Sequence, residues 1–276
     1  MENKVVLITG CSTGIGRALA LSFKKSNFVV YATARRIEDL DDLKSSGIKT
    51  GKLDVNNSED IKRVVDLIQE EDGSIDILVN NAGYAVMGPI AELPVESIRL
   101  QMETNVVSIA AMSQAVTPGM IERKEGTIVN IGSVSGVLAT PFSGIYCASK
   151  AAVHAMSDAM RMELAPFNIR VLTVQPGAIK SSFGDTASKS VAGYNGGDNS
   201  FYTPIADAIQ QRAQSSQENP TPVEEFSEKL VSEIMLGKKE VVRIGRMSTY
   251  IPFMARWLSK SLLDKILSKK FSLNKL

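Results

Sequence analysis

The sequence predicts an α/β fold: a doubly wound, seven-stranded parallel sheet of the Rossmann type, in a single domain with a helical C-terminal extension. Short β-branched runs alternate with longer amphipathic stretches, which is the pattern of βαβ units. The short runs are almost continuously apolar, as expected for strands covered on both faces. A glycine-rich turn directly follows the first of these runs.

Seven strands and six helices follow from this alternation. The expected strands cover 5–9, 28–33, 48–53, 75–80, 126–131, 169–175 and 240–244, and the expected helices lie near 15–26, 37–46, 58–71, 96–122, 146–166 and 222–236. The segment 180–221 is rich in Ser, Gly, Asn and Gln, so we expect an irregular substrate loop there, with a surface insertion as the alternative. Residues 1–245 are expected to form the Rossmann domain and 246–276 the extension.

Composition excludes several classes of protein. A formal net charge of +1 gives no reason to expect nucleic-acid binding. Two cysteines and one histidine are too few for a zinc site, and we expect no metal. The N-terminus lacks the pattern of a signal peptide, and no apolar run reaches about 18 residues, so we expect a cytoplasmic protein.

The C-terminal extension differs in charge from the rest of the chain. From Arg246 onward there are seven basic residues and one acidic residue, a net charge of +6, which leaves −5 for the remainder. The extension is amphipathic and holds the sole tryptophan, Trp257. It is therefore expected to lie on an anionic membrane surface, to fold over the active site, or to pack between subunits.

The glycine-rich turn has the composition of a phosphate-binding loop. Glycines allow a tight turn and a close approach of the backbone to a ligand, and the N-terminus of the following helix favours an anion. About 20 residues on, where an NAD site usually has an acid, the chain instead has Arg35 and Arg36. These side chains suit a 2′-phosphate, so NADP(H) is expected, with Ser12 as a further donor; alternatively, both arginines are merely solvated.

Tyr146 and Lys150 are spaced to share one face of a helix. The ammonium group is expected to lower the pKa of the phenol towards neutral, so that the tyrosine can act as a general acid or base. This spacing is common on solvated helices, so the pair depends on its context.

That context resembles the compact branch of the short-chain dehydrogenase/reductase family over about residues 4–245. The resemblance rests on Thr9-Gly10-xxx-Gly14-Ile15-Gly16, Asp54, Asn80-Asn81-Ala82-Gly83, Asn105, Ser133, Tyr146-xxx-Lys150 and Pro176-Gly177, in the family's order. It implies hydride transfer between nicotinamide and a carbonyl or secondary alcohol. Tyr146 would exchange the proton, Ser133 would polarise the oxygen, Lys150 would hold the ribose, and Asn105 would anchor a water.

The resemblance also implies the residues that bind the cofactor. They are Gly10, Ser12, Thr13, Gly14, Ile15, Gly16, Arg35, Arg36, Asp54, Val55, Asn81, Ala82, Gly83, Tyr146, Lys150, Pro176, Gly177, Ile179 and Ser181. Cys11, Cys147 and His154 are interpreted as packing residues.

The substrate is expected to be apolar. Besides Ser133 and Tyr146, the candidate contacts are Phe142 and Phe183, with Val137, Leu138, Ala139, Pro141, Tyr194, Phe201 and Tyr202 as further lining. The extension and the run at 31–36 are similar to those of 1-acyldihydroxyacetone-phosphate reductases, and the run is also similar to that of the retinol and 17β-hydroxysteroid dehydrogenases. These similarities suggest a lipid-, steroid- or retinoid-like substrate.

Two other functions remain open at this point. One is a catalytically silent NADP(H) sensor, and the other is a peripheral membrane protein that acts through 250–276. The family resemblance further implies a homodimer or homotetramer paired through the helices near 96–122 and 146–166.

Overall fold

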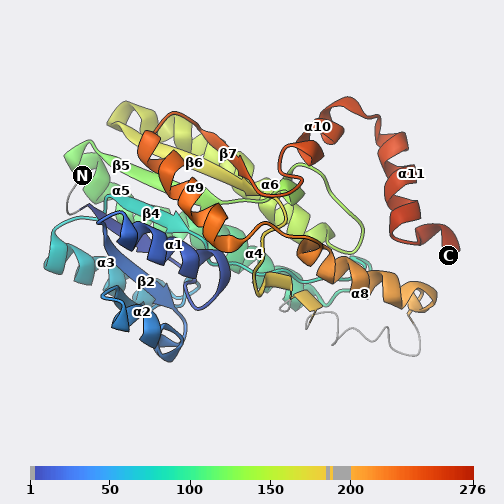
Figure 1. Ribbon diagram of the computed structural model, residues 1–276, viewed down its shortest axis with the longest axis horizontal. Coiled ribbons are helices and arrows are strands. Elements are labelled where there is room, and N and C mark those ends of the chain that lie inside the picture. Colours follow the sequence, from blue (N-terminus) through green and yellow to red (C-terminus); the bar gives the residue numbers. More distant parts are fainter. Residues whose placement is uncertain (1–3, 185–186, 189–199) are drawn as a thin grey trace.

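A seven-stranded parallel sheet forms the centre of the molecule (Figure 1). The computed structural model describes residues 4–184, 187–188 and 200–276. The strand order is β3-β2-β1-β4-β5-β6-β7. The strands are β1 (Val5–Ile8), β2 (Val29–Ala34), β3 (Lys49–Lys52), β4 (Ile77–Asn80), β5 (Gly126–Ile131), β6 (Ile169–Pro176) and β7 (Val241–Ile244). The predicted fold class is confirmed.

The order of the strands reverses beside β1, since Val5 pairs with Val29 of β2 and Val6 pairs with Ile77 of β4. In open parallel sheets, ligands bind outside the carboxyl ends of the strands at such a reversal. The glycine-rich turn leaves β1 at this point.

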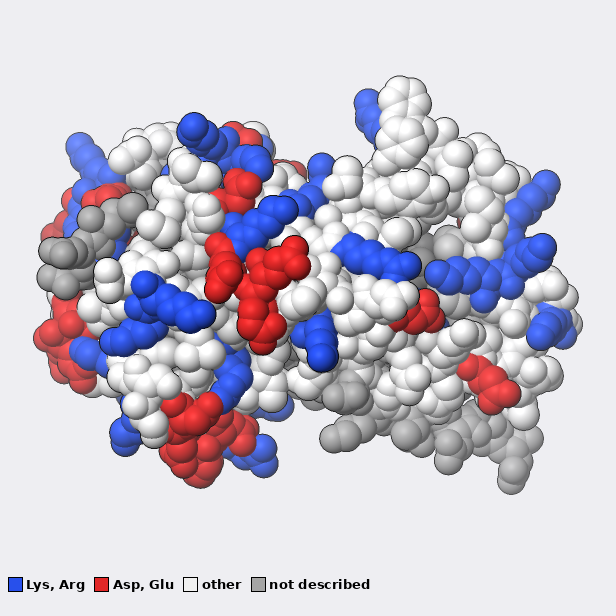
Figure 2. Space-filling view, viewed as in Figure 1, with Lys and Arg blue, Asp and Glu red and all other residues white. Residues whose placement is uncertain are grey.

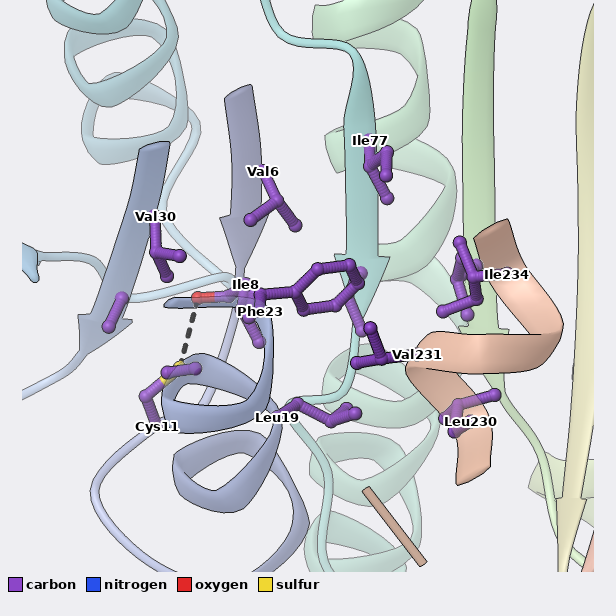
Figure 3. Close-up of a cluster of buried hydrophobic side chains, with 14 of the residues drawn as sticks. Val6, Ile8, Cys11, Leu19, Phe23, Val30, Ile77, Leu230, Val231 and Ile234 are labelled. Atoms are coloured by element: carbon purple, nitrogen blue, oxygen red, sulfur yellow. Dashed lines mark hydrogen bonds between the residues drawn. The ribbon is translucent and has the colours of Figure 1, made fainter. Parts of the chain in front are cut away.

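One face of the sheet is covered by α1 (Gly14–Lys25), α2 (Asp41–Ser45) and α9 (Val223–Leu236). Figure 3 shows Leu19 and Phe23 of α1 meeting Val231 of α9 above the strands. Burying each such large apolar side chain stabilises the fold by on the order of 2 kcal/mol. Cys11 belongs to this cluster as a buried free thiol, in agreement with its interpretation as a packing residue.

The opposite face is covered by α3 (Ser58–Asp72), α5 (Ser108–Arg123) and α6 (Gly144–Leu164). The single helix expected near 96–122 is instead α4 (Val95–Met102), a π-helical turn (Glu103–Val107) and α5. The π turn inserts extra backbone and changes the direction of the side chains within it. Asn105, which is fully buried, lies in this turn.

The segment expected to be irregular contains a helix, α8 (Ala206–Gln214), and the extension forms α10 (Tyr250–Trp257) and α11 (Lys260–Lys270). These three helices lie together at one end of the molecule (Figure 1). A separate apolar cluster joins Ile209 of α8 to Phe142, Tyr146 and Phe271. The prediction for Tyr194 falls outside the described residues.

Charge is distributed unevenly between the two ends. Figure 2 shows acidic side chains mostly over the end that carries α1 to α3, whereas mostly basic side chains edge the end that carries α11. No helix among the described residues is both long and apolar enough to cross a membrane. The same residues hold no cluster of His, Cys, Asp and Glu side chains suited to a metal ion.

Candidate active site

A cavity of about 760 Å³ lies at the carboxyl ends of the strands. Its walls come from the loops that follow β1 to β6, from α8 and from the C-terminal extension. The cavity joins most of the predicted cofactor residues to Ser133, Tyr146 and Lys150. Segments far apart in the sequence therefore form one site.

The turn after β1 is shaped for close contact with a ligand. Gly10 has a φ of +71°, and a Cβ atom there would lie 2.9 Å from the backbone of Ala82. Helix α1 begins at Gly14 with no side-chain cap and no acidic residue in its first turn. Its N–H groups and positive dipole end are thus available to an anion, as a pyrophosphate site requires.

Asn81 supports this turn from the neighbouring strand. Its side-chain amide donates to the carbonyl oxygens of Thr9 (2.8 Å) and Gly10 (3.0 Å). The hydroxyl of Thr9 accepts in return from the backbone N–H groups of Asn81 and Ala82, both at 3.0 Å. The loops after β1 and β4 are therefore bound to each other, which fixes the floor of the cavity.

The two arginines after β2 have different positions. Arg35 lines the cavity, while Arg36 does not and is paired with Asp39 at 2.9 Å. Arg35 is thus a candidate ligand for the 2′-phosphate, whereas Arg36 forms a solvated ion pair. The geometry of Arg36 agrees with the alternative interpretation, in which this arginine is a solvated surface residue.

Tyr146 and Lys150 are both buried on α6. The ammonium nitrogen of Lys150 donates to the carbonyl oxygen of Ile131 at 2.7 Å and lies 5.9 Å from the centre of the Tyr146 ring. Ser133 lies in the loop after β5, and its hydroxyl accepts from the backbone N–H of Ser135 at 3.1 Å. The three side chains line the same part of the cavity.

Burial controls the protonation of this pair. It raises the pKa of Tyr146 to about 12, although hydrogen bonding with Ser133 and the charge of Arg212 oppose the rise. It lowers the pKa of Lys150 to about 8. The expected fall in the pKa of the tyrosine is therefore wrong for this structure, because desolvation outweighs the hydrogen bond with Ser133 and the charge of Arg212, and Lys150 is not among the groups that lower this pKa. The phenol is protonated at neutral pH and is ready to donate a proton.

Asn105 does not line the cavity, but it holds the residues that do. Its amide donates to the carbonyl oxygen of Tyr84 (2.9 Å) and to the hydroxyl of Ser149 (3.0 Å), and its carbonyl accepts from the N–H of Tyr84 (3.1 Å). These bonds attach the loop after β4 to α6, one residue before Lys150. The water relay expected of Asn105 stays a prediction.

His154 has a position that the sequence interpretation missed. Its Nε2 accepts from the backbone N–H of Ser133 at 3.4 Å, and burial lowers its pKa to about 4. The neutral ring thus supports the loop that carries Ser133. The spacing of Tyr146, Lys150 and His154, four residues each, places all three on one helix face and is a signal that could have identified this role.

Some of the predicted substrate residues line the cavity and others do not. Phe183 lines the cavity and packs against Tyr146 with ring centres 5.2 Å apart. Phe142 does not line it; its ring is buried against Tyr202. Leu138 lines the cavity, whereas Phe201 is exposed to solvent. Six of the predicted substrate residues do not line the cavity: Val137, Ala139, Pro141, Phe142, Phe201 and Tyr202. Gly16, which was predicted to bind the cofactor, is also absent from the lining.

The largest omission of the sequence interpretation is Arg212 of α8, a buried residue that lines the cavity. Lys270 and Phe271 of the extension line it too. Arg212 lies in a stretch rich in Gln and Ser, without any motif around it. No local pattern could have placed it near Tyr146.

Comparison with known proteins adds independent evidence. The family model described as short chain dehydrogenase matches residues 4–191. A protein of Schizosaccharomyces pombe named NADPH-dependent 1-acyldihydroxyacetone phosphate reductase is 36% identical over 225 residues, which are 81% of this chain and 73% of that protein. The protein of the same name from Saccharomyces cerevisiae is 31% identical over 281 residues, covering 99% and 92%.

Among solved structures, a short-chain dehydrogenase from Streptomyces avermitilis superimposes with a TM-score of 0.79. It is 27% identical, and the match covers 100% of this chain and 97% of that one. The similarity therefore includes the C-terminal extension as well as the sheet.

Proposed function

The chain belongs to the short chain dehydrogenase family, and from this premise we propose that it is an NADP(H)-dependent oxidoreductase for an apolar, lipid-like substrate. It would transfer hydride between nicotinamide and a carbonyl or secondary alcohol. One observation carries the proposal: a single cavity joins a phosphate-binding turn, a protonated buried tyrosine and an apolar wall.

The cofactor fits the polar half of the cavity. The Gly10 turn, where a Cβ would meet Ala82, and the uncapped start of α1 suit a pyrophosphate, while Arg35 and Ser12 suit a 2′-phosphate. Asp54 and Val55 would border the adenine. The nicotinamide would be bordered by Pro176, Gly177, Ile179 and Ser181. Lys150 would contact the ribose that carries the nicotinamide. When bound, the nicotinamide supplies or accepts the hydride.

Tyr146 would supply the proton of the reaction. In the reductive direction the carbonyl carbon gains a hydride and its oxygen gains a proton, and the protonated phenol is the donor at hand. Ser133 would hold the same oxygen by a hydrogen bond, which stabilises the negative charge that develops on it. His154 and Asn105 would act indirectly, by positioning Ser133 and the loop beside Lys150.

The substrate half is mostly apolar. Its wall includes Met87, Leu100, Leu138, Phe183, Ile251 and Phe271. Such a lining favours an acyl chain or another extended apolar group over a sugar. The names of the relatives from the two yeasts agree with a lipid-like substrate.

The test is a panel of ketones, aldehydes, steroids, retinoids and acyl-dihydroxyacetone phosphate, with NADPH oxidation as the readout. We expect turnover of at least one apolar carbonyl with NADPH, and much weaker turnover with NADH. Tight NADPH binding without any turnover would favour the catalytically silent sensor instead. Tighter binding of NADH than of NADPH would contradict the role of Arg35.

A second function is favoured by the exposed aromatic side chains of α10. Tyr250, Phe253 and Trp257 are exposed, Trp257 by 71%, on an extension with a net charge of +6. Aromatic and basic side chains together favour the surface of an anionic membrane. We expect the doubly substituted F253S/W257S protein to lose binding to phosphatidylserine vesicles but to keep its turnover of a soluble substrate. Equal vesicle binding by both proteins would remove the idea.

These substitutions are preferable to deleting 250–276, because Ile251, Lys270 and Phe271 line the cavity. A deletion would change the membrane surface and the substrate site at once.

Self-association is also part of the proposal. Val107 of the π turn and Met162 of α6 are exposed apolar residues on the two helical regions expected to pair. We expect a homodimer or homotetramer by light scattering, and dissociation in the M162E variant. A monomer at micromolar concentration would contradict this part.

A further inference from the structure

Arg212 is a cation held inside the substrate half of the cavity. Only 8% of its surface is exposed, and it lines the cavity together with Ser133 and Tyr146. Long charged side chains are rarely buried to this extent unless an opposite charge accompanies them. The charge balance around Arg212 therefore decides what it does.

Its hydrogen-bond partners are all neutral hydroxyl groups. Nε and Nη2 donate to the hydroxyl of Thr140 at 3.1 and 2.8 Å, Nη2 also to Ser143 at 2.8 Å, and Nη1 to Ser215 at 2.9 Å. Within the described part of the chain, no carboxylate lies within ion-pair distance of the guanidinium. The side chain is thus fixed in place, while its charge has no counter-ion among the residues that the structure describes.

The surroundings that the structure describes supply no carboxylate to balance this positive charge. The guanidinium lies over the ring of Phe271, 5.8 Å from its centre, in a cation–π contact that only partly stabilises the charge, and Lys270 adds a second cation to the cavity lining. Of the acidic residues in the lining, Asp54 follows β3 at the cofactor side and Glu218 is exposed. Among the described residues, the two titratable groups that interact with the charge of Arg212 are the thiol of Cys147 and the phenol of Tyr146, and neither is a carboxylate.

We propose that Arg212, with Lys270 over the same Phe271 ring, forms an oxyanion subsite, so that the preferred substrate is an apolar carbonyl compound that also carries a phosphate or a carboxylate. The proposal rests on the proposed function and narrows its substrate class. A guanidinium donates charge-assisted hydrogen bonds to either oxyanion, and four of its five N–H donors are already engaged with hydroxyls that hold it in position. The oxyanion would supply the missing counter-charge, while the acyl or other apolar part would contact the wall formed by Leu138, Phe183 and Phe271.

A purely structural role predicts something different. If Arg212 only fastens α8 to the loop that carries Thr140 and Ser143, its removal would weaken all ligands equally or lower stability. An oxyanion subsite predicts that the loss is confined to charged ligands. The measurement must therefore compare ligands that differ only in their head group.

We would titrate the full chain, saturated with NADPH, with octyl phosphate, octanoate and 1-octanol in a calorimeter. None of these compounds carries a ketone or aldehyde that could accept a hydride from NADPH, so the result is independent of turnover. The wild-type protein is expected to bind at least one of the two anions about 10-fold or more tightly than octanol. The anion that binds more tightly identifies the head group as a phosphate or a carboxylate.

The variants then assign the preference to Arg212. R212Q, which can still hydrogen-bond to Thr140, is expected to lose about 10-fold or more of the anion affinity and to keep the affinity for octanol. R212K should retain part of the preference. K265Q removes an exposed charge of the same extension that lies outside the cavity lining, and it should behave as wild type.

Two results would overturn the proposal. One is a wild-type protein that binds neither anion more tightly than octanol. The other is an R212Q protein that still binds NADPH and prefers the anion over octanol as strongly as the wild type does. If R212Q fails to fold, the wild-type ratio and R212K decide the matter. A protein that reduces no carbonyl but shows a preference dependent on Arg212 would refute the proposed function and leave the subsite standing.

Discussion

The two halves of the cavity are built in different ways. The cofactor half is mostly backbone, held by Gly10, the start of α1 and the hydrogen bonds of Asn81, and each part directly follows a strand of the sheet. The substrate half is made of side chains from α6, α8 and the extension, and it includes Arg212 and Phe271. The first half is specified by local spacing, whereas the second depends on segments meeting in space.

This difference has a consequence for substitutions. Changes in the cofactor half should impair binding of NADP(H) whatever the substrate. Changes in the substrate half should alter which compound is accepted and leave cofactor affinity nearly intact. Tyr146 lies where the halves meet, and its replacement should have the largest effect.

Replacing Tyr146 with phenylalanine should lower kcat about 1000-fold, because it removes the proton donor and keeps the ring that packs on Phe183. NADPH affinity, measured by fluorescence titration, should change less than about threefold. Y250F, which removes an exposed hydroxyl from α10, is the matched control and should retain full activity. Normal turnover by Y146F would remove the tyrosine from the mechanism.

Replacing Gly10 with alanine tests the backbone nature of the cofactor half. A side chain there adopts an unfavourable positive φ and lies 2.9 Å from the backbone of Ala82, so we expect a loss of on the order of 3 kcal/mol in unfolding free energy. Gly73 has a similar φ of +74° but open space around it, so G73A should cost only about 1 kcal/mol. Equal losses in urea unfolding would show that the close contact is unimportant.

The two arginines after β2 sharpen the comparison within the cofactor half. R35S should weaken NADPH binding about 30-fold and leave NADH binding unchanged, because only NADPH carries the 2′-phosphate. R36S should change either affinity less than about threefold, since Arg36 is paired with Asp39 outside the cavity. The reverse order of effects would place the phosphate on Arg36.

His154 should link stability to pH by a smaller amount. Burial holds its pKa near 4 in the folded protein, below the ordinary value of 6.5, so the unfolded chain takes up a proton first as the pH falls. Its contribution to stability is complete above pH 6.5 and is lost progressively towards pH 4. At pH 5, we expect the wild type to lose about 2 kcal/mol more than H154Q, relative to pH 7.5.

Urea unfolding at the two pH values would measure this difference. H154Q is the control for the wild-type protein, because glutamine does not titrate. Parallel losses in both proteins would mean that His154 does not contribute.

The cofactor half of the cavity was largely predictable from the sequence, and the substrate half was not. The seven strands were predictable because buried parallel strands are continuous apolar runs, and β5 agrees with its predicted bounds residue for residue. The glycine turn, Arg35 and the Tyr146–Lys150 pair lie at fixed distances from these strands. Their grouping in one cavity follows once the strands pair.

Three features were out of reach for physical reasons. The π turn at Asn105 is set by contacts with Tyr84 and Ser149, both distant in sequence. Helix α8 has small and polar residues around Ile209, so its apolar face is weak until it meets Phe142 and Phe271. The pKa of Tyr146 depends on burial, which the spacing to Lys150 does not reveal.

The central claim is hydride transfer from NADPH to a carbonyl carbon in this cavity. It is tested most directly with NADPH carrying deuterium at both C4 positions, an apolar ketone that the wild-type protein reduces, and mass spectrometry of the alcohol. We predict one deuterium on the carbinol carbon of each product molecule. An alcohol without deuterium would contradict the claim, as would consumption of the cofactor without reduction of any carbonyl compound.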